Sequence, residues 1–139
     1  MKAIMFADFG GADVLHLAEA PPPEIRPDDI LVKVMAAGVN RADLLQREGV
    51  YGTQTYGDSP ILGLEIAGEV VATGSAVIGF AIGDRVMGIV GGGAYAQYAR
   101  LDSEMAAIIP DGMSFIEAAA VMESFVTGLG SPRPSRTDC

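Results

Sequence analysis

The chain has 139 residues, enough for one ordinary domain with a proper core but not for two. Half of the residues are apolar and 19% are charged, which argues against disorder, while 18 glycines and eight prolines argue against a helical bundle. The formal net charge is -9 without a basic cluster, which argues against nucleic acid as a partner.

Cysteine usage and the apolar segments indicate the location of the protein. Cys139 is the single cysteine and the last residue, so neither an internal disulfide nor a cysteine-rich zinc lobe can form. Residues 1–11 alternate and lack the continuous apolar centre of a signal peptide. No stretch approaches the ~18 uncharged apolar residues that cross a bilayer. We therefore expect a cytoplasmic protein without a membrane partner.

The first hundred residues have the pattern of β-strands. Residues 2–7 alternate with period two and are predicted to pair, through a turn, with residues 14–20. The proline-rich residues 21–29 are predicted to be an extended surface connection, because proline lacks a ladder donor. Glycine punctuation and β-branched residues predict a bent, rolled antiparallel sheet. Its further strands are expected at residues 30–39, 64–74, 83–90 and 94–101.

One short helix is predicted to interrupt the strands after residue 39. Asn40 is a suitable N-cap, and Gly49 suits the position just past the helix end. Ala42, Leu44 and Leu45 are expected to form its apolar side.

A second helix is predicted near the end of the chain. Ser114 and Glu117 have the spacing of a capping box, and an alanine-rich helix is expected from about Phe115 to Thr127. Residues 131–139 are polar and without periodicity, so we expect them to be disordered.

Residues 91–96 suggest a cofactor site and His16 suggests a metal site, but we interpret both as structural features of the sheet. Residues 91–96, GGGAYA, fit a degenerate dinucleotide fingerprint, but that fingerprint requires a helix directly after it, and a strand pattern follows. We interpret the segment as a strand connection. His16 is the only histidine, and one histidine without a nearby cysteine cannot form a zinc site. It is interpreted as an outward-facing polar residue on a strand.

Two acidic residues and a polar corner are further candidates. Glu65 and Glu69 face the same side of a predicted strand about 13 Å apart, too far to share a proton. Glu65 alone is either a buried acid that supports a site or a purely structural residue. Asn40, Arg41 and Tyr51 surround the strand-to-helix turn. In the structural interpretation, Asn40 caps the helix, Arg41 is solvated and the Tyr51 ring packs against its neighbours. In the functional interpretation, the three groups assist a reaction without a metal.

One long segment resembles the signature of the medium-chain dehydrogenase/reductase superfamily. Residues 60–88 contain a Gly-x-Glu element, a valine-rich strand and Gly-Asp-Arg-Val at the family's spacing. The resemblance covers residues 1–127 and implies the GroES-like catalytic domain, a rolled and partly open β-barrel. The matching residues are Gly63, Glu65, Gly68, Val70, Gly74, Gly83, Asp84, Arg85 and Val86.

The departures from this signature are informative about metal. Zinc-dependent members carry a cysteine and a histidine where this chain has Asn40 and Leu64, and residues 88–94 lack the structural-zinc cysteines. Without thiolate or imidazole, tetrahedral zinc is not available. The pattern resembles the zinc-free quinone oxidoreductases, and residues 40–51 are most similar to p53-inducible-type quinone reductases.

The resemblance implies roles for individual residues. Asn40 and Tyr51 are the implied catalytic residues, with a neutral amide and phenol meeting the developing oxyanion as a hydride is delivered. No metal ligand is implied. The residues expected to contact NADPH are Asn40, Arg41, Tyr51, Met122, Glu123 and Thr127.

The same resemblance implies a division of the chain. Residues 1–113 correspond to the catalytic domain, residues 114–130 begin the helix that links to a cofactor domain, and residues 131–139 do not resemble the family. Full-length relatives are expected to be homodimers with a Rossmann domain, which is absent here. We expect a truncated product that exposes apolar surface and tends to associate.

These observations lead to one function with two alternatives. The chain is expected to be the substrate-side domain of an NADPH-dependent quinone oxidoreductase that is inactive alone. One alternative is a 2-enoyl-thioester reductase of the same superfamily. The other is an inert or partner-binding fragment without catalysis, so whether these 139 residues act as an enzyme is left open.

Overall fold

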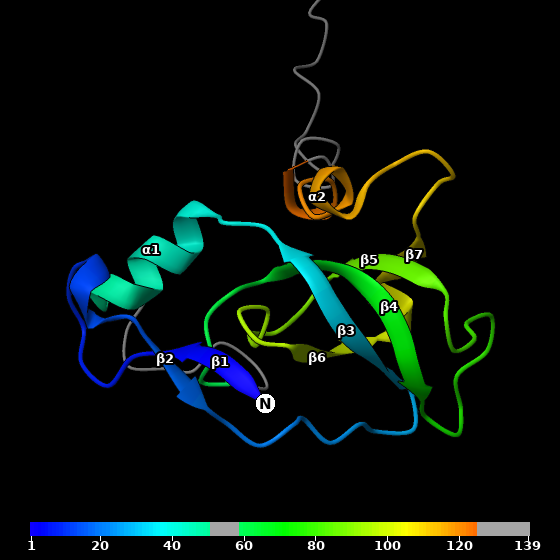
Figure 1. The fold of residues 1–139 in the computed structure, drawn as a ribbon, viewed down its shortest axis with the longest axis horizontal. Helices are drawn as coiled ribbons and strands as arrows, with labels where there is room; N and C mark the ends of the chain where they lie inside the picture. Colours follow the sequence, from blue (N-terminus) through cyan, green and yellow to red (C-terminus); the bar gives the residue numbers. More distant parts are fainter. Residues whose placement is uncertain (51–58, 125–139) are drawn as a thin grey trace, which may run out of the picture.

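The computed structural model describes residues 1–50 and 59–124, which form a mainly β fold with two short α-helices (Figure 1). A five-stranded antiparallel sheet has the order β6-β3-β4-β5-β7, and β1 and β2 form a separate pair. The strands are β1 (Lys2–Met5), β2 (His16–Glu19), β3 (Asp29–Ala37), β4 (Glu65–Thr73), β5 (Arg85–Ile89), β6 (Tyr98–Asp102) and β7 (Ala106–Ile108). The helical elements are η1 (Ala12–Val14), α1 (Arg41–Glu48), η2 (Ser103–Met105) and α2 (Phe115–Ala118).

The predicted rolled antiparallel sheet is confirmed as a half-barrel built around β3 and β4. The pairing of these two nine-residue strands shifts register between Leu31 and Val32 and again between Val34 and Ala36. Such irregularities bend a strand and increase its twist, which curls the sheet around its core. The apolar residues inside the curl are Ile30, Val32, Ile66, Val70, Val86, Val90, Ala94, Ala99 and Leu101.

Strands β1 and β2 pair as the alternating sequence predicted, and this hairpin lies beside the sheet (Figure 1). It joins the main body through an antiparallel bridge between Ala3 and Ala96 and a 2.8 Å hydrogen bond from the Ile4 N–H to the Tyr95 carbonyl. His16 lies on β2 and is exposed, as expected. Residues 91–96 connect β5 to β6 and no helix follows them, so the strand-connection interpretation is confirmed.

Strand boundaries at the sheet edges differ from the predictions. The strand expected at 94–101 begins only at Tyr98, because residues 94–96 instead pair with the chain around Ile61 and with β1. The edge strand β7 was not predicted. It has three residues and directly follows η2, so it shows too few alternations to form a pattern.

Helix α1 has the predicted ends but not the predicted buried side. Asn40 is the N-cap, and Gly49 closes the helix in the left-handed conformation at φ 81°. The expectation of an apolar side is wrong, because the buried residues of α1 are Asp43 and Gln46 while Leu44 is 40% exposed. On this side, Asp43 accepts a 2.8 Å hydrogen bond from the hydroxyl of Tyr95, in the connection between β5 and β6, and an apolar residue at position 43 would leave that hydroxyl without this acceptor.

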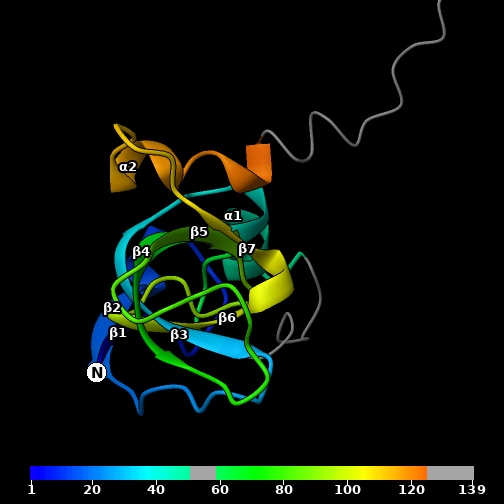
Figure 2. The same ribbon diagram turned by 90° about the vertical axis from the view of Figure 1, so that its right-hand side faces the viewer.

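Helix α2 covers the outer face of the sheet (Figure 2). The Ser114–Glu117 capping box is confirmed, and Ala118 and Ala119 pack against Ala67 of β4. The continuous helix expected from 115 to 127 is wrong in its middle, because residues 119–121 form a turn before a helical segment at 122–124. The remainder of that prediction and the expected disorder of 131–139 lie outside the described residues.

Candidate functional site

The predicted polar corner lies where β3 ends and the chain turns into α1 (Figure 1). Asn40 is half-buried there as the helix cap. Its amide nitrogen donates a 3.2 Å hydrogen bond to Glu65 Oε2, across 25 residues of sequence. Its side-chain oxygen faces the backbone N–H of Asp43 in a capping-box arrangement. The Asp43 N–H makes its 3.0 Å hydrogen bond to the backbone carbonyl of Asn40, so the bond to Glu65 is the one that holds the side-chain amide.

Glu65 is the centre of this corner. The residue is 1% exposed at the start of β4, and its backbone carbonyl accepts a 3.0 Å bond from the Gly38 N–H. Its second carboxylate oxygen, Oε1, accepts a 2.9 Å bond from the backbone N–H of Glu123. One carboxylate thus joins the α1 cap to the segment that follows α2.

Gly38 makes this approach possible. A Cβ atom at this position would overlap Glu65 Oε2 and lie 2.7 Å from the carbonyl oxygen of Ala119. Real Cβ atoms essentially never come that close to another heavy atom, so any side chain here would displace the carboxylate or the turn after α2. The glycine is required for steric reasons.

A second buried carboxylate lies directly behind Asn40. Asp43 is 3% exposed, and its Oδ2 accepts a 2.9 Å bond from the Asn40 backbone N–H and a 2.8 Å bond from the Tyr95 hydroxyl. Burial of Tyr95, together with this bond and the charge of Asp43, raises the pKa of the phenol well above its ordinary value. Tyr95 is therefore a neutral donor that fixes the helix start.

The structure brings together some of the predicted site residues. Asn40 and the backbone of Glu123 meet at Glu65, and Met122 is partly buried against the apolar cluster under α2. Arg41 is exposed on the first turn of α1. Tyr51 and Thr127 lie outside the described residues.

Three residues of the corner were not predicted as part of it. Asp43 has a signal in the sequence, since an acid three residues after an N-cap is the capping-box spacing. Gly38 and Tyr95 give no such signal, because their contacts join segments that are far apart in sequence. Glu65 was predicted as a possible buried acid, and its burial is confirmed. Glu69, on the same strand, is exposed.

The donor set at the corner does not fit zinc. At the two positions where zinc-dependent relatives are expected to have cysteine and histidine, this chain has Asn40 and the half-buried Leu64. In residues 1–50 and 59–124, no group of three or more His, Cys, Asp and Glu side chains could hold a metal ion. A single carboxylate with amide neighbours lacks the thiolate and imidazole ligands that tetrahedral zinc prefers.

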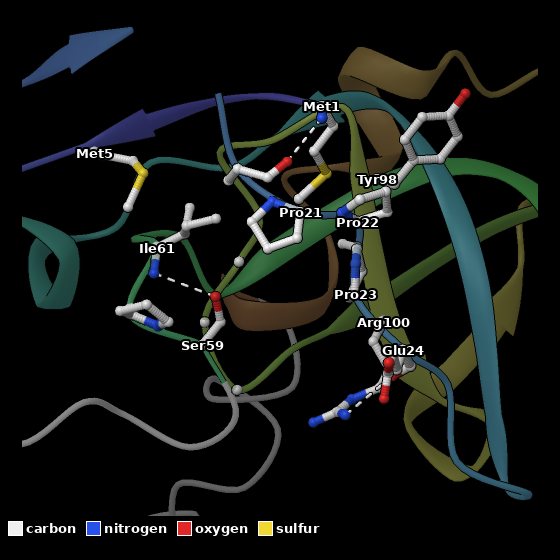
Figure 3. Close-up of a pocket in the computed structure, with 16 residues that line it drawn as sticks. Met1, Met5, Pro21, Pro22, Pro23, Glu24, Ser59, Ile61, Tyr98 and Arg100 are labelled. Atoms are coloured by element: carbon white, nitrogen blue, oxygen red, sulfur yellow. Dashed lines mark hydrogen bonds between the residues drawn. The ribbon is translucent and has the colours of Figure 1, made fainter. Parts of the chain in front are cut away.

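A separate pocket of about 270 Å³ lies away from this corner, between the start of β1 and the edge strand β6 (Figure 3). Its wall is mostly apolar and includes residues 21–23, Ile61 and Ala99. Neither Asn40 nor Glu65 lines it. Across the described part of the chain, no helix is long and apolar enough to span a membrane.

Comparison with known proteins identifies the fold. Residues 26–111 match the model of the alcohol dehydrogenase GroES-like domain. The quinone oxidoreductase of Pseudomonas aeruginosa is 42% identical over 122 residues, which cover 87% of this chain and 37% of that protein. The human synaptic vesicle membrane protein VAT-1 homolog-like is 39% identical over 128 residues, which cover 91% of this chain and 30% of that protein.

Solved structures agree with the sequence comparisons. The quinone oxidoreductase from Coxiella burnetii superposes with a TM-score of 0.84 at 36% identity, covering 93% of this chain and 43% of that one. The Escherichia coli quinone oxidoreductase complexed with NADPH gives a TM-score of 0.80 at 36% identity, covering 93% of this chain and 38% of that one. The chain thus spans 30% to 43% of the length of these relatives. It belongs to the alcohol dehydrogenase GroES-like domain family, the N-terminal domain of the medium-chain dehydrogenases/reductases.

Proposed function

We propose that this chain is the acceptor-side domain of a zinc-independent, NADPH-dependent quinone oxidoreductase of the p53-inducible type. The observation that carries the proposal is the corner itself, where an amide held by a buried carboxylate stands in place of zinc ligands. The similarity to quinone oxidoreductases from three bacteria supports the choice of reaction.

The corner fits the needs of hydride transfer to a quinone. NADPH, when bound, would supply the hydride, and a proton from solvent would complete the hydroquinone. Asn40 donates one amide N–H to Glu65, and its side-chain oxygen faces the start of α1, which leaves one uncharged N–H without a hydrogen-bond partner among the described residues. A neutral donor stabilises developing oxyanion charge without binding the ground state as tightly as a cation would.

The other predicted residues complete the proposed site. Tyr51 is the second catalytic donor in this proposal, and Arg41 presents an exposed guanidinium one residue from Asn40. Met122 and Glu123 lie on the segment that Glu65 ties to the corner, four to five residues before Thr127. We propose that these residues contact the nicotinamide end of NADPH.

The proposal divides the work between two domains. Residues 1–113 form the acceptor side, and residues 114–130 lead toward a dinucleotide-binding domain that the 139 residues do not contain. A Rossmann domain binds the pyrophosphate at a helix N-terminus and supplies much of the dinucleotide affinity. The 139-residue chain alone is therefore expected to bind NADPH weakly and to reduce quinones poorly, and the two-domain protein is expected to be a homodimer.

Two alternatives have specific support. The chain is 35% identical over 134 residues to the 2-methylene-furan-3-one reductase of Solanum lycopersicum and to an NADPH-dependent alkenal/one oxidoreductase of Arabidopsis thaliana. These relatives favour a conjugated alkene as the hydride acceptor, a class that includes 2-enoyl thioesters. The second alternative, an inert or partner-binding fragment, is motivated by the relatives that are named as synaptic vesicle membrane proteins and not for a reaction.

A chimera tests the proposed function. Residues 1–124 replace the matched segment of the Pseudomonas aeruginosa quinone oxidoreductase, and NADPH oxidation is measured with quinones, 2-enones and 2-enoyl thioesters as acceptors. The proposal expects turnover with quinones that persists after metal chelation and falls in Asn40→Ala. Preference for an alkene acceptor supports the first alternative. A folded chimera that oxidises NADPH with none of these acceptors supports the second.

A further inference from the structure

Within residues 1–50 and 59–124, the hydrogen-bond donors to the buried Glu65 carboxylate are uncharged. The side chain is 1% exposed, and its two oxygens accept bonds from the Asn40 amide and the Glu123 backbone. Asp29 is equally buried but pairs with Arg26 at 2.9 Å and Arg100 at 3.4 Å. A buried charge without a cation is costly, and apolar residues of similar volume often stabilise a protein more. The burial cost of the carboxylate therefore offsets part of what its two hydrogen bonds contribute to stability.

The carboxylate determines the orientation of the Asn40 amide. An ionised carboxylate only accepts hydrogen bonds, so it faces the amide nitrogen of Asn40 and disfavours the carbonyl oxygen. At the start of α1, the backbone N–H of Asp43 faces the Asn40 side-chain oxygen, and a donor there favours an oxygen at that end of the amide. Together they select one of the two amide orientations and leave the second N–H of the same nitrogen available.

The same carboxylate also connects two separate segments. Oε1 is bound by the backbone N–H of Glu123, which follows α2, while Oε2 is bound by Asn40 at the start of α1. A glutamine at position 65 could not satisfy both donors, since its amide offers one acceptor oxygen and would turn a donor toward the other N–H. Glutamate is therefore the residue type that holds both segments through short, uncharged donors.

We infer that Glu65 is a positioning residue of the proposed hydride-transfer site, a role that rests on the proposed function of Asn40. It orients the Asn40 amide so that one N–H is free for the acceptor or the nicotinamide carboxamide. It also keeps residues 122–124 at a fixed place relative to that amide.

A spectroscopic test addresses the orientation without any activity. Asn40 is the only asparagine of the chain, so selective ¹⁵N-asparagine labelling of the 139-residue protein gives one side-chain amide signal. The wild type is expected to show one side-chain proton shifted downfield and slow to exchange with solvent. Glu65→Met keeps an apolar side chain of similar length, and it is expected to fold while losing both signatures. Glu69→Gln, an exposed position on the same strand, is the matched control and is expected to keep them.

Kinetics in the chimera separate a positioning role from a structural one. Because a hydrogen bond to a charged group is lost, kcat of Glu65→Met is expected to fall about tenfold or more while KM for the quinone changes less. Glu69→Gln is expected to match the wild type. Unchanged kcat in a folded Glu65→Met chimera, or an Asn40 signal that does not respond to the substitution, overturns the inference. An inactive wild-type chimera overturns the proposed function instead, and the Asn40 signal then still decides whether Glu65 orients the amide.

Discussion

Substitution of Gly38 by alanine tests the close packing around Glu65. The new Cβ would overlap the Glu65 carboxylate and lie 2.7 Å from the Ala119 carbonyl oxygen, where ordinary contacts begin at 3.4 Å. Overpacking of this kind costs about 1–3 kcal/mol. Displacement of the carboxylate weakens its bonds, and one hydrogen bond to a charged group contributes about 1.5–3 kcal/mol. We expect the free energy of unfolding to fall by about 3 kcal/mol.

Urea unfolding followed by far-UV circular dichroism measures this loss. With a typical slope of about 1–3 kcal/mol per molar urea, the midpoint should fall by about 1–3 M. Val39→Ala changes the next residue, which is 74% exposed, and should stay within about 0.5 kcal/mol of the wild type. In a Glu65→Ala background, Gly38→Ala should cost less, because the side chain that the new Cβ would overlap is gone. An equal cost in both backgrounds, or a loss as small as that of Val39→Ala, would refute the reasoning.

Three further predictions concern other parts of the corner and the barrel. Tyr95→Phe removes the 2.8 Å bond to buried Asp43 and should lower the free energy of unfolding by about 1.5–3 kcal/mol in urea, whereas Tyr98→Phe should have little effect. Because folding raises the pKa of Tyr95, the stabilisation from its hydroxyl is complete below the ordinary tyrosine pKa of 10.0 and is lost as pH rises above that value. The melting temperature should therefore fall at alkaline pH, and Tyr95→Phe should reduce this fall. Burial raises the pKa of Asp29, but the hydrogen bonds and charge of Arg26 outweigh burial and hold that pKa below 3.8. The stabilisation from ionised Asp29 is therefore present above pH 3.8 and is lost as pH falls below it. Asp29→Asn should lower the free energy of unfolding at pH 7 and make it depend less on pH in acid.

The sequence predicted the parts of the fold that depend on local pattern. Period-two alternation located β1 and β2, β-branched residues with glycine punctuation located β3, β4 and β5, and cap residues located both ends of α1. It did not predict β7, which is too short to show a pattern, or the break at residues 119–121, where alanines favour a helix that the structure interrupts. The apolar side expected for α1 was wrong because the fully buried residues are Asp43, which accepts a hydrogen bond from the Tyr95 hydroxyl, and Gln46.

The candidate site was predictable in its residue types but not in its connections. The sequence alone shows Asn40 and Leu64 at the two positions where zinc-dependent relatives are expected to have cysteine and histidine. The link from Asn40 to Glu65 spans 25 residues and the link from Glu65 to Glu123 spans 58, so neither has a local signature. Only the three-dimensional fold shows that one carboxylate joins these segments and that Gly38 leaves room for it.

Quinone-dependent oxidation of NADPH by the chimera that carries residues 1–124, after treatment with a metal chelator, tests the central claim most directly. If the Asn40 amide, held by Glu65, stabilises the developing oxyanion in place of a metal ion, turnover with quinones should persist after chelation and should fall sharply in Asn40→Ala. A folded chimera whose quinone reduction requires added zinc, or is the same with and without the Asn40 amide, would contradict it.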